Sequence, residues 1–558
     1  MFGLSNQSKY EQTEYAPLRV ARALLEGKED DVRKYLGESN VKTWINTNVT
    51  QIYEKPATMF GTVLGVACQW STAANVKELL SERIGADWMK PDSNGDLPLH
   101  DACKSTIDSE EKVKLLLEAD KDKQSLQSTN KHGNTPIHIA AKNGKTAIVE
   151  RLVASASNVR EIVSQTGQRK RQALHFAAGC GEISTVQALL SHQASVDCRD
   201  DEQHTPLTIA SFYGKTKVVE LLLKHKALIN AQTQHGRTGL HEAVSQGHVH
   251  TVEKLLQLQA DTRITDADGD TALSFAAYFD RPEMIDMLIE HGGKDDMNSR
   301  NKNYSAPLHV ASSRGHGAVI EKLLKHGADI EASDRDDDTP LIVACENNQI
   351  HAVKVLLDHS ASVRATDRFQ RTALHGAAWQ GNVECVKLLL EAGSCVDATD
   401  DDRCSALHLA VAGNHLEVVK LLIAKHANVQ LKDGGKNSVI DIAIDVMNED
   451  DVTEADEDDV SQDGDDVSML EYLLNSGKFP ASSLPPLSKF ETNSDVHKLV
   501  VRKVLEETTP EVIYSCVQRL LTKIRDQIDP TQCGKHLFDQ KILSHVELSK
   551  AVNVRMIF

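Results

Sequence analysis

The sequence predicts an all-α solenoid, in which helix-turn-helix repeats stack in a row and β-hairpin fingers join one repeat to the next. Three observations lead to this fold class. A tetrapeptide similar to Thr-Pro-Leu-His recurs along most of the chain, largely at intervals of 33 residues. Each occurrence opens a short helical pattern, which a second, amphipathic pattern follows. With 558 residues, the chain is also too long for one ordinary core.

The recurrence is measured from the apolar residue of each tetrapeptide, which we call the anchor. Successive anchors are 33 residues apart from Leu174 onward, with one step of 35, and the earlier steps of 38 and 37 predict insertions in those connections. A fixed period of this length is typical of a repeat architecture. The anchors are Leu99, Ile137, Leu174, Leu207, Leu240, Leu273, Leu308, Leu341, Leu374, Leu407 and Ile440.

One unit shows why the pattern predicts two helices. Thr339 caps free N–H groups, and Pro340 is tolerated in the first turn of a helix. The small residues Ala344 and Cys345 let the next repeat approach closely, and residues 353–357 supply a second helix with one apolar face. Neither helix buries its apolar face alone, so each repeat needs its neighbours.

These repeats resemble the ankyrin family, whose 33-residue unit contains Thr-Pro-Leu-His followed by two alanines. Residues 135–141 and 305–311 are close matches to that motif, and residues 327–330 match the family's turn after the second helix. The resemblance covers most of the chain and implies the ankyrin fold. It says little about the partner, because function resides in particular sites on a fold.

We therefore divide the chain into four parts. The last two follow from a proline-containing stretch after the array and from helical periodicity beyond it. The parts are residues 1–94 with two degenerate ankyrin-like repeats (near Ala16–Leu36 and Leu64–Leu80), residues 95–477 with an array of eleven recognisable units, a linker at 478–490 and a helical C-terminal tail at 491–558.

Two features distinguish the chain from a plain array. Residues 449–466 contain eleven Asp or Glu among eighteen residues, and we predict that they form an acidic loop inserted between the two helices of the last repeat. This loop either keeps the array soluble or attracts a basic partner. The tail either caps the end of the array or presents a helix to a partner.

Composition and charge narrow the possible partners and the compartment. Hydrophobic residues make up 40% and charged residues 26%, as in soluble globular proteins, and the net charge of −19 argues against nucleic acid. No apolar run is long enough to span a membrane, and the first residues lack the pattern of a signal peptide. The ten cysteines form no Cys-x-x-Cys pair, so we expect reduced thiols and a cytoplasmic location.

No motif for catalysis or cofactor binding is found, neither a phosphate loop nor a nucleophile elbow nor a kinase catalytic loop, so we expect no enzyme activity, no cofactor and no metal. His241 and Glu242 begin like a zinc-protease helix, but Ser245 stands where that motif needs its second histidine. We expect the histidines of the tetrapeptide to bond neighbouring backbone and order the fingers. They are His100, His138, His175, His241, His309, His375 and His408.

Six aromatic side chains are the candidate protein-binding residues. In the ankyrin family the fingers and first helices form a concave groove that binds proteins, and the two residues after the Ala-Ala pair face it. Aromatic residues make up only 4% of this chain, yet three repeats carry them there, and such residues are enriched in binding hot spots. The alternative is that the rings fold against adjacent repeats. The candidates are Phe212, Tyr213, Tyr278, Phe279, Trp379 and, at a finger tip, Phe369.

The predicted function is that of an intracellular scaffold or adaptor that binds proteins. The chain is similar to many-repeat scaffolds of the inversin type, and this similarity implies a protein kinase as a partner. The alternative is a substrate-recognition subunit of a ubiquitin ligase, in which the C-terminal tail recruits the ligase.

Overall fold

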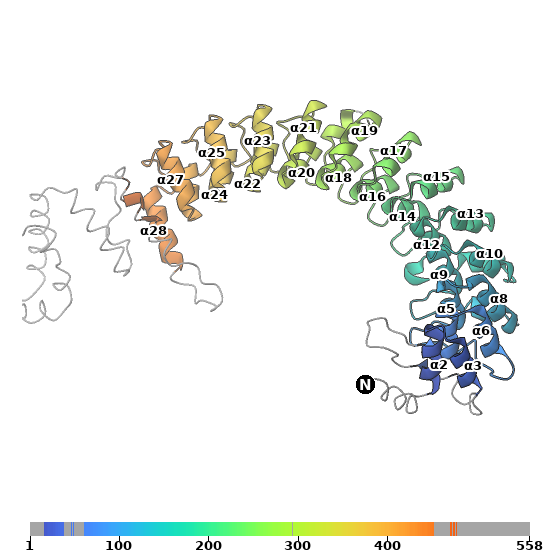
Figure 1. Cartoon of the computed structure of the whole chain (residues 1–558). Helices are drawn as coiled ribbons and strands as arrows, with labels where there is room; N and C mark the ends of the chain where they lie inside the picture. Colours follow the sequence, from blue (N-terminus) through green and yellow to red (C-terminus); the bar gives the residue numbers. More distant parts are fainter. Residues whose placement is uncertain are drawn as a thin grey trace, which may run out of the picture. The chain divides into compact units, whose positions relative to one another are not determined.

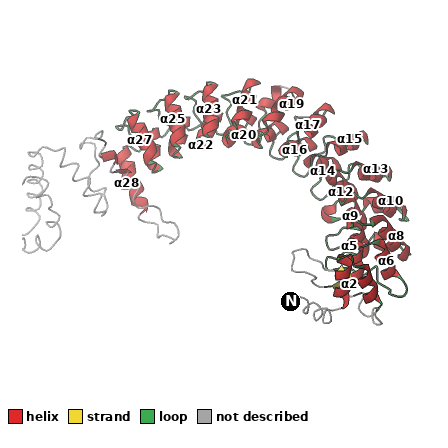
Figure 2. Ribbon diagram, in the orientation of Figure 1, coloured by secondary structure: helices red, strands yellow, loops and turns green. Residues whose placement is uncertain are grey.

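The computed structural model describes residues 16–37, 46, 48–49, 61–292 and 294–450, and residues 469–476 apart from 471 and 475. The chain divides into two compact units, Met1–Ala361 and Ser362–Phe558, which are described separately. Both units are built from the same element, a pair of short helices followed by a finger (Figures 1 and 2). This confirms the predicted all-α stack of paired helices.

The first unit contains two layers of helices (Figure 1). The first helices of the pairs contact one another in succession, and the second helices from α6 onward do the same. The first helices are α2 (Ala16–Leu25), α5 (Val63–Trp70), α7 (Pro98–Lys104), α9 (Pro136–Lys142), α12 (Ala173–Cys180), α14 (Pro206–Phe212), α16 (Gly239–Ser245), α18 (Ala272–Tyr278), α20 (Pro307–Arg314) and α22 (Pro340–Glu346). The second helices are α3 (Glu29–Leu36), α6 (Ala73–Leu80), α8 (Ser109–Ala119), α10 (Thr146–Ala154), α13 (Ile183–Ser191), α15 (Thr216–Lys224), α17 (Val249–Gln257), α19 (Pro282–Gly292), α21 (Gly317–Lys325) and α23 (Ile350–Asp358).

The first helices begin as the sequence predicts. At α14, the Thr205 side chain accepts the N–H of Thr208, and Pro206 occupies the first turn, where a missing N–H does no harm. The anchor Leu207 and Ala210, three residues on, are fully buried. All eleven anchors are at most 3% exposed, so the recurring apolar residue marks the core of every repeat.

The fingers are tight turns that the main chain and one side chain close. In the finger before α18, the N–H of Asp266 donates to the carbonyl of Asp270 (N···O 2.9 Å). The Asp266 carboxylate accepts the N–H groups of Asp268 (2.8 Å) and Asp270 (3.0 Å). Neighbouring fingers are joined at their tips, where the N–H of Lys302 donates to the carbonyl of Asp268 (2.9 Å). Such bonds hold successive fingers of the first unit in register.

The predicted insertions are found in the long connections. The step of 38 residues contains the 3-10 helix η1 (Gln124–Leu126), and the step of 37 contains an extra helix α11 (Val159–Ser164) and η2 (Gln168–Lys170). The step of 35 contains η3 (Lys294–Asn298). The insertions follow second helices and leave the first-helix layer continuous.

A short hairpin precedes α5 in the first unit. Strands β1 (Asn48–Val49) and β2 (Gly61–Thr62) pair antiparallel, with Asn48 opposite Thr62. The layer of first helices begins before this hairpin, because α2 contacts α5 and α5 contacts α7. Among the described helices of the chain, none is long and apolar enough to cross a bilayer.

The second unit repeats the same arrangement over fewer repeats. Its first helices are α24 (Ala373–Trp379), α26 (Ala406–Ala412) and α28 (Val439–Asp450), and its second helices are α25 (Val383–Glu391) and α27 (Leu416–Ala424). Helix α26 contacts both α24 and α28. Isolated β-bridges close two fingers, Thr366 with Thr372 and Thr399 with Ser405.

The end of the array lies in this unit. Helix α28 includes Glu449 and Asp450, the first two residues of the predicted acidic insertion. Helical residues resume at Met469, and the described apolar side chains there are buried. The rest of the insertion, the linker at 478–490 and the tail at 491–558 lie outside the described residues.

Candidate functional site

The predicted binding residues lie mainly where first helices end. Phe212 is the last residue of α14 and Tyr213 follows it, Tyr278 and Phe279 stand in the same relation to α18, and Trp379 ends α24. Each of these helices has only seven residues, so its anchor and the residues three and four further on face the core. The next two positions lie beyond this buried stripe. With Phe369, the six side chains are 37–51% exposed.

The four aromatic residues of the first unit form two pairs. The rings of Phe212 and Tyr213 meet edge to face at 5.0 Å, and those of Tyr278 and Phe279 at 4.9 Å. The Tyr213 ring also lies against the preceding repeat, where a Cβ added to Gly179 would be 3.4 Å from ring atoms. The rings therefore contact neighbouring residues in part and remain exposed in part, and their role in binding stays a prediction.

A histidine of the following repeat fixes the main chain at each aromatic helix end. In each case the ring Nε2–H donates to the carbonyl of the aromatic residue, at 2.8–3.2 Å. The pairs are His248 with Phe212, His316 with Tyr278, and His415 with Trp379. Since these bonds use only main-chain carbonyls of the aromatic residues, truncating an aromatic side chain leaves them in place.

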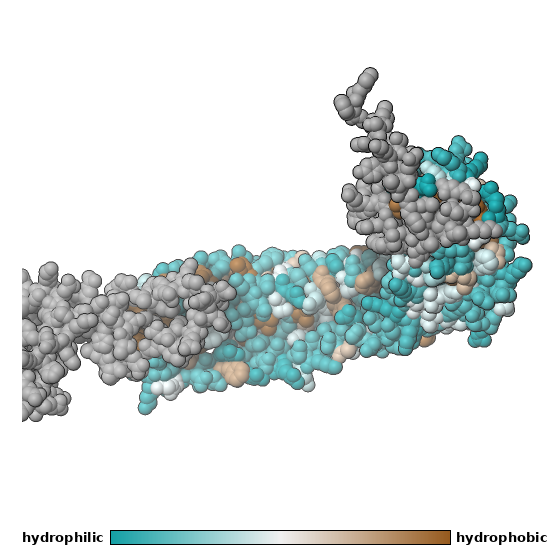
Figure 3. Space-filling model, turned by 90° about the horizontal axis from the view of Figure 1, so that it is seen from below, coloured by the Kyte–Doolittle hydropathy of each residue, from teal (hydrophilic) through white to brown (hydrophobic). Residues whose placement is uncertain are grey.

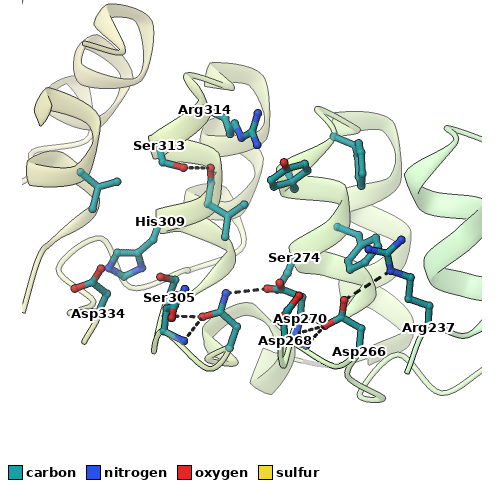
Figure 4. A pocket seen from close by; sticks show the side chains of 17 residues that line it. Arg237, Asp266, Asp268, Asp270, Ser274, Ser305, His309, Ser313, Arg314 and Asp334 are labelled. Atoms are coloured by element: carbon teal, nitrogen blue, oxygen red, sulfur yellow. Dashed lines mark hydrogen bonds and ion pairs between the residues drawn. The ribbon is translucent and has the colours of Figure 1, made fainter. Parts of the chain in front are cut away.

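A pocket of about 610 Å³ opens beside the second aromatic pair, within the first unit (Figure 4). Helices α18, α20 and α22 line one side of it, and four successive fingers line the other. The helix side supplies Ser274, Phe275, Tyr278, Phe279, His309, Val310, Ser313, Arg314 and Val343, and the finger side supplies Arg237, Asp266, Asp268, Asp270, Asn301, Asn303, Ser305 and Asp334. The volume is in the range of about 300–1,000 Å³ typical of ligand pockets.

The two arginines of this pocket lie over aromatic rings. The guanidinium carbon of Arg314 is 3.9 Å from the centroid of the Tyr278 ring, and that of Arg237 is 5.1 Å from the Phe275 ring. Arg237 is also 3.8 Å from the Asp266 carboxylate. Arg314 thus lies at the aromatic end of this pocket, whereas Arg237 and Asp266 lie at its finger end.

Phe369, at a finger tip of the second unit, lies beside two arginines. The guanidinium carbons of Arg368 and Arg371 lie 4.7 and 4.9 Å from the centroid of the Phe369 ring, and Arg371 pairs with Asp367 (2.7 Å). Within the described part of this unit, no ring contact joins Phe369 to Trp379. The two rings thus form separate apolar spots. A space-filling view likewise shows several apolar patches on a mostly hydrophilic surface (Figure 3).

Among the residues that the structure describes, two further exposed aromatic side chains lie outside the six candidates. Trp70 ends α5, six residues after Leu64, and is 48% exposed. It occupies the same position relative to Leu64 as Tyr213 does relative to Leu207, but this repeat lies outside the anchor series because Gly65 stands where the tetrapeptide has its histidine. Tyr304, next to a finger tip, is 55% exposed with a φ of +59°. Aligning Leu64 with the anchors would have found Trp70.

The tetrapeptide histidines have a structural role, which confirms the expectation that they bond backbone. At His241, Nδ1 accepts the N–H of Thr238 (3.2 Å) and Nε2 donates to the carbonyl of Asp270 in the next finger (3.2 Å). A main-chain N–H only donates and a carbonyl only accepts, so the imidazole is neutral with its hydrogen on Nε2. Burial lowers the pKa of His100, His138 and His241 to about 4.

Histidine and acidic side chains do not gather into a metal site in the part of the chain that the structure describes, where no group of three or more His, Cys, Asp or Glu is placed to hold an ion. His241 and Glu242, which begin like a zinc-protease helix, are both buried. Burial raises the pKa of Glu242, and the nearby positive charge of Arg237 offsets part of this rise. These two residues are therefore part of the packing of α16.

Comparison with known proteins agrees with the repeat geometry. The sequence profile of the family described as ankyrin repeats (3 copies) matches overlapping segments, at residues 64–162, 137–233, 174–266, 228–298, 293–367 and 362–433. The first segment begins at Leu64, so the profile includes the repeat that carries Trp70.

The similar proteins are diverse, and the chain spans only a small part of the length of the first two relatives named here. The chain is 30% identical over 163 residues to a transient receptor potential cation channel subfamily A member 1 homolog of Caenorhabditis elegans, covering 29% of this chain and 12% of that protein. It is 32% identical over 149 residues to neurogenic locus notch homolog protein 1 of Xenopus tropicalis, covering 27% of this chain and 6% of that protein. The crystal structure of the ankyrin repeat domain of Bcl-3, a member of the IkappaB protein family, is 27% identical with a TM-score of 0.35, and the match covers 37% of this chain and 94% of that one.

The family profile spans residues 64 to 433 and so matches more than half of the chain. Within that span, the buried anchors, the capped first helices and the joined fingers recur from repeat to repeat. The chain belongs to the ankyrin-repeat family.

Proposed function

We propose that this protein is a scaffold or adaptor that binds partner proteins through the aromatic residues at the ends of its first helices. Ankyrin repeats imply protein–protein interaction. The observation that carries the proposal is the exposure of Tyr213, Phe279 and Trp379 at equivalent helix ends in a chain with few aromatic residues. Large rings with few rotatable bonds give much contact area at a small loss of entropy.

The finer part of the proposal concerns the kind of partner. We infer that the chain organises a signalling complex that contains a protein kinase, on the basis of its similarity to many-repeat scaffolds of the inversin type. The proposal assigns no reaction and no cofactor to the chain itself, and it places the protein in the cytoplasm.

The test is affinity capture followed by mass spectrometry from cells that express the full chain. The triple variant Tyr213→Ala/Phe279→Ala/Trp379→Ala is expected to lose the captured proteins. The matched control is Leu228→Ala/Leu258→Ala, because these exposed leucines follow the second helices α15 and α17, away from the first-helix ends. Capture that survives in the triple variant would contradict the aromatic binding surface.

A chain that ends at residue 477 separates the two partner classes. A kinase retained by this shortened chain supports the scaffold. Ubiquitin-ligase subunits that are captured by the full chain and lost on truncation would indicate a substrate-recognition subunit instead.

A further inference from the structure

The pocket of the first unit has two chemically different sides. On the helix side, the rings of Tyr278 and Phe279 are 44% and 37% exposed. Phe275 also lines this side, and its ring centroid is 5.9 Å from that of Phe279. The finger side carries four carboxylates from two fingers, with polar groups of the intervening finger between them (Figure 4). The carboxylates belong to Asp266, Asp268, Asp270 and Asp334.

Two of these carboxylates mainly serve the fingers. Asp266 accepts the N–H groups of Asp268 and Asp270, and Asp334 does the same in its own finger at 2.9 and 3.0 Å. Asp270 accepts one bond, from the side-chain amide of Asn301 (3.0 Å). The exposed Asp268 carboxylate has no hydrogen bond or ion pair with any residue that the structure describes. Asp268 and Asp270 are thus the carboxylates with free capacity for a ligand.

The charge in the pocket is unbalanced. Four carboxylates share it with two guanidinium groups, and Arg314 lies at the aromatic end over Tyr278 rather than among the carboxylates. Burial raises the pKa of Asp270, and the nearby carboxylates of Asp266 and Asp268 raise it further. A cation at the finger side would relieve this repulsion, whereas an anion would increase it.

We propose that this pocket binds an extended peptide segment of a partner protein, with an arginine or lysine side chain at Asp268 and Asp270 and an apolar side chain on the Tyr278 and Phe279 rings. This inference rests on the proposed function, because it names the chemistry of a partner for the same surface. Asn303 and Ser305, on the finger that follows Asp268 and Asp270, line the same pocket. Their side chains supply hydrogen-bonding groups for the peptide's main chain, which an extended segment leaves unpaired.

The first step of the test is selection of a phage-displayed random dodecapeptide library on the purified full chain, with counter-selection on Tyr278→Ala/Phe279→Ala. Enriched peptides are expected to contain a basic residue and an apolar residue at a fixed spacing. Peptides without a basic residue, or the failure to enrich any peptide that depends on Tyr278 and Phe279, would overturn the inference.

The second step measures the affinity of synthetic copies of the enriched peptides by fluorescence anisotropy. Asp268→Asn/Asp270→Asn is expected to weaken binding at least about tenfold, and added salt is expected to weaken wild-type binding as well. Asparagine keeps the size and an acceptor oxygen at both positions, and circular dichroism melts verify that all variants are folded. The control Glu283→Gln, which removes one exposed charge from the second helix α19, is expected to bind normally.

The outcomes also separate this inference from the proposed function. Equal affinity in Asp268→Asn/Asp270→Asn, or enrichment of acidic peptides, overturns the basic-peptide inference. If the triple aromatic variant still loses its captured proteins in that case, the aromatic binding surface stands without the charge preference.

Discussion

The two ends of the first helices differ in what they conserve from repeat to repeat. At the N-terminal end a buried histidine recurs, and its ring bonds both its own helix start and the next finger. At the C-terminal end the residues vary, from Lys142 in α9 to Tyr278 in α18, and the aromatic ones are exposed. The comparison teaches that in these repeats, positions that hold the stack and positions free to bind lie only about one helical turn apart.

The difference follows from the length of the helix. Seven residues provide one buried stripe, which the anchor and the small residues after it fill. The last residue of the helix and the residue after it lie outside this buried stripe. At the aromatic helix ends, a histidine of the following repeat binds the main-chain carbonyl, so the bond does not depend on the aromatic side chain. Variation at that end is therefore compatible with an unchanged stack.

The largest expected effect concerns the anchors. Leu240→Ala removes a side chain that is 1% exposed and is expected to lower the free energy of unfolding by about 2–5 kcal/mol, because it leaves a cavity between repeats. Urea denaturation followed by circular dichroism measures this loss. Leu258→Ala, an exposed leucine two residues after the last apolar contact of α17, is the control and should change little. Equal midpoints for the two variants would contradict the assignment of the core.

The next effect concerns the histidine position. His241→Ala leaves the Thr238 N–H without its partner and removes one of the two hydrogen bonds that the Asp270 carbonyl accepts, and it is expected to destabilise the array by about 1–3 kcal/mol. His250→Ala, at an exposed position of α17, should behave like the wild type. A thermal melt of His241→Ala that matches the wild type would show that the ring is dispensable.

The same position predicts a pH dependence. The folded chain holds the pKa of His241 at about 4, below the value of 6.5 in the unfolded chain. Between these pH values the unfolded state binds more protons, so this contribution to stability is complete above about pH 6.5 and is lost as the pH falls toward 4. Urea midpoints measured across this interval should fall less steeply for His241→Ala than for the wild type. Identical slopes would refute the contribution of His241.

The smallest effect on stability is expected at the C-terminal ends of the first helices, where the aromatic side chains are exposed. Tyr278→Ala removes the ring under Arg314 and its contact with Phe279, and the expected loss is about 0.5–1 kcal/mol. A thermal melt measures it beside His241→Ala. A loss as large as that of the histidine variant would show that this ring serves the packing of the repeats and would remove the contrast between the two ends.

The fold could be predicted from the sequence because the same pattern of capping, apolar and small residues recurs along the array. The eleven anchors and the tetrapeptide histidines follow from periodicity alone, and all of them are buried. The extra helix α11 could only be predicted as an insertion, since it has no counterpart in the other repeats. Trp70 was missed because its repeat lacks the tetrapeptide, although its helix begins with the same threonine cap at Thr62.

The pocket could be predicted only in part. The position of Tyr278 and Phe279 follows from the anchor at Leu273. The neighbouring carboxylates come from fingers up to 56 residues away from Tyr278, and their approach depends on the bonds between fingers, such as that from Lys302 to Asp268. Periodicity does not show which charges those bonds bring beside a given ring.

The separation of folding and binding is tested most directly by two variants measured in two assays, His241→Ala and Tyr213→Ala/Phe279→Ala/Trp379→Ala. The assays are the thermal melt by circular dichroism and affinity capture at a temperature where both variants are folded. We predict that the histidine variant melts earlier and keeps its captured proteins, while the aromatic variant keeps its melting temperature within a few degrees and loses them. Parallel losses of stability and capture in both variants would contradict the account.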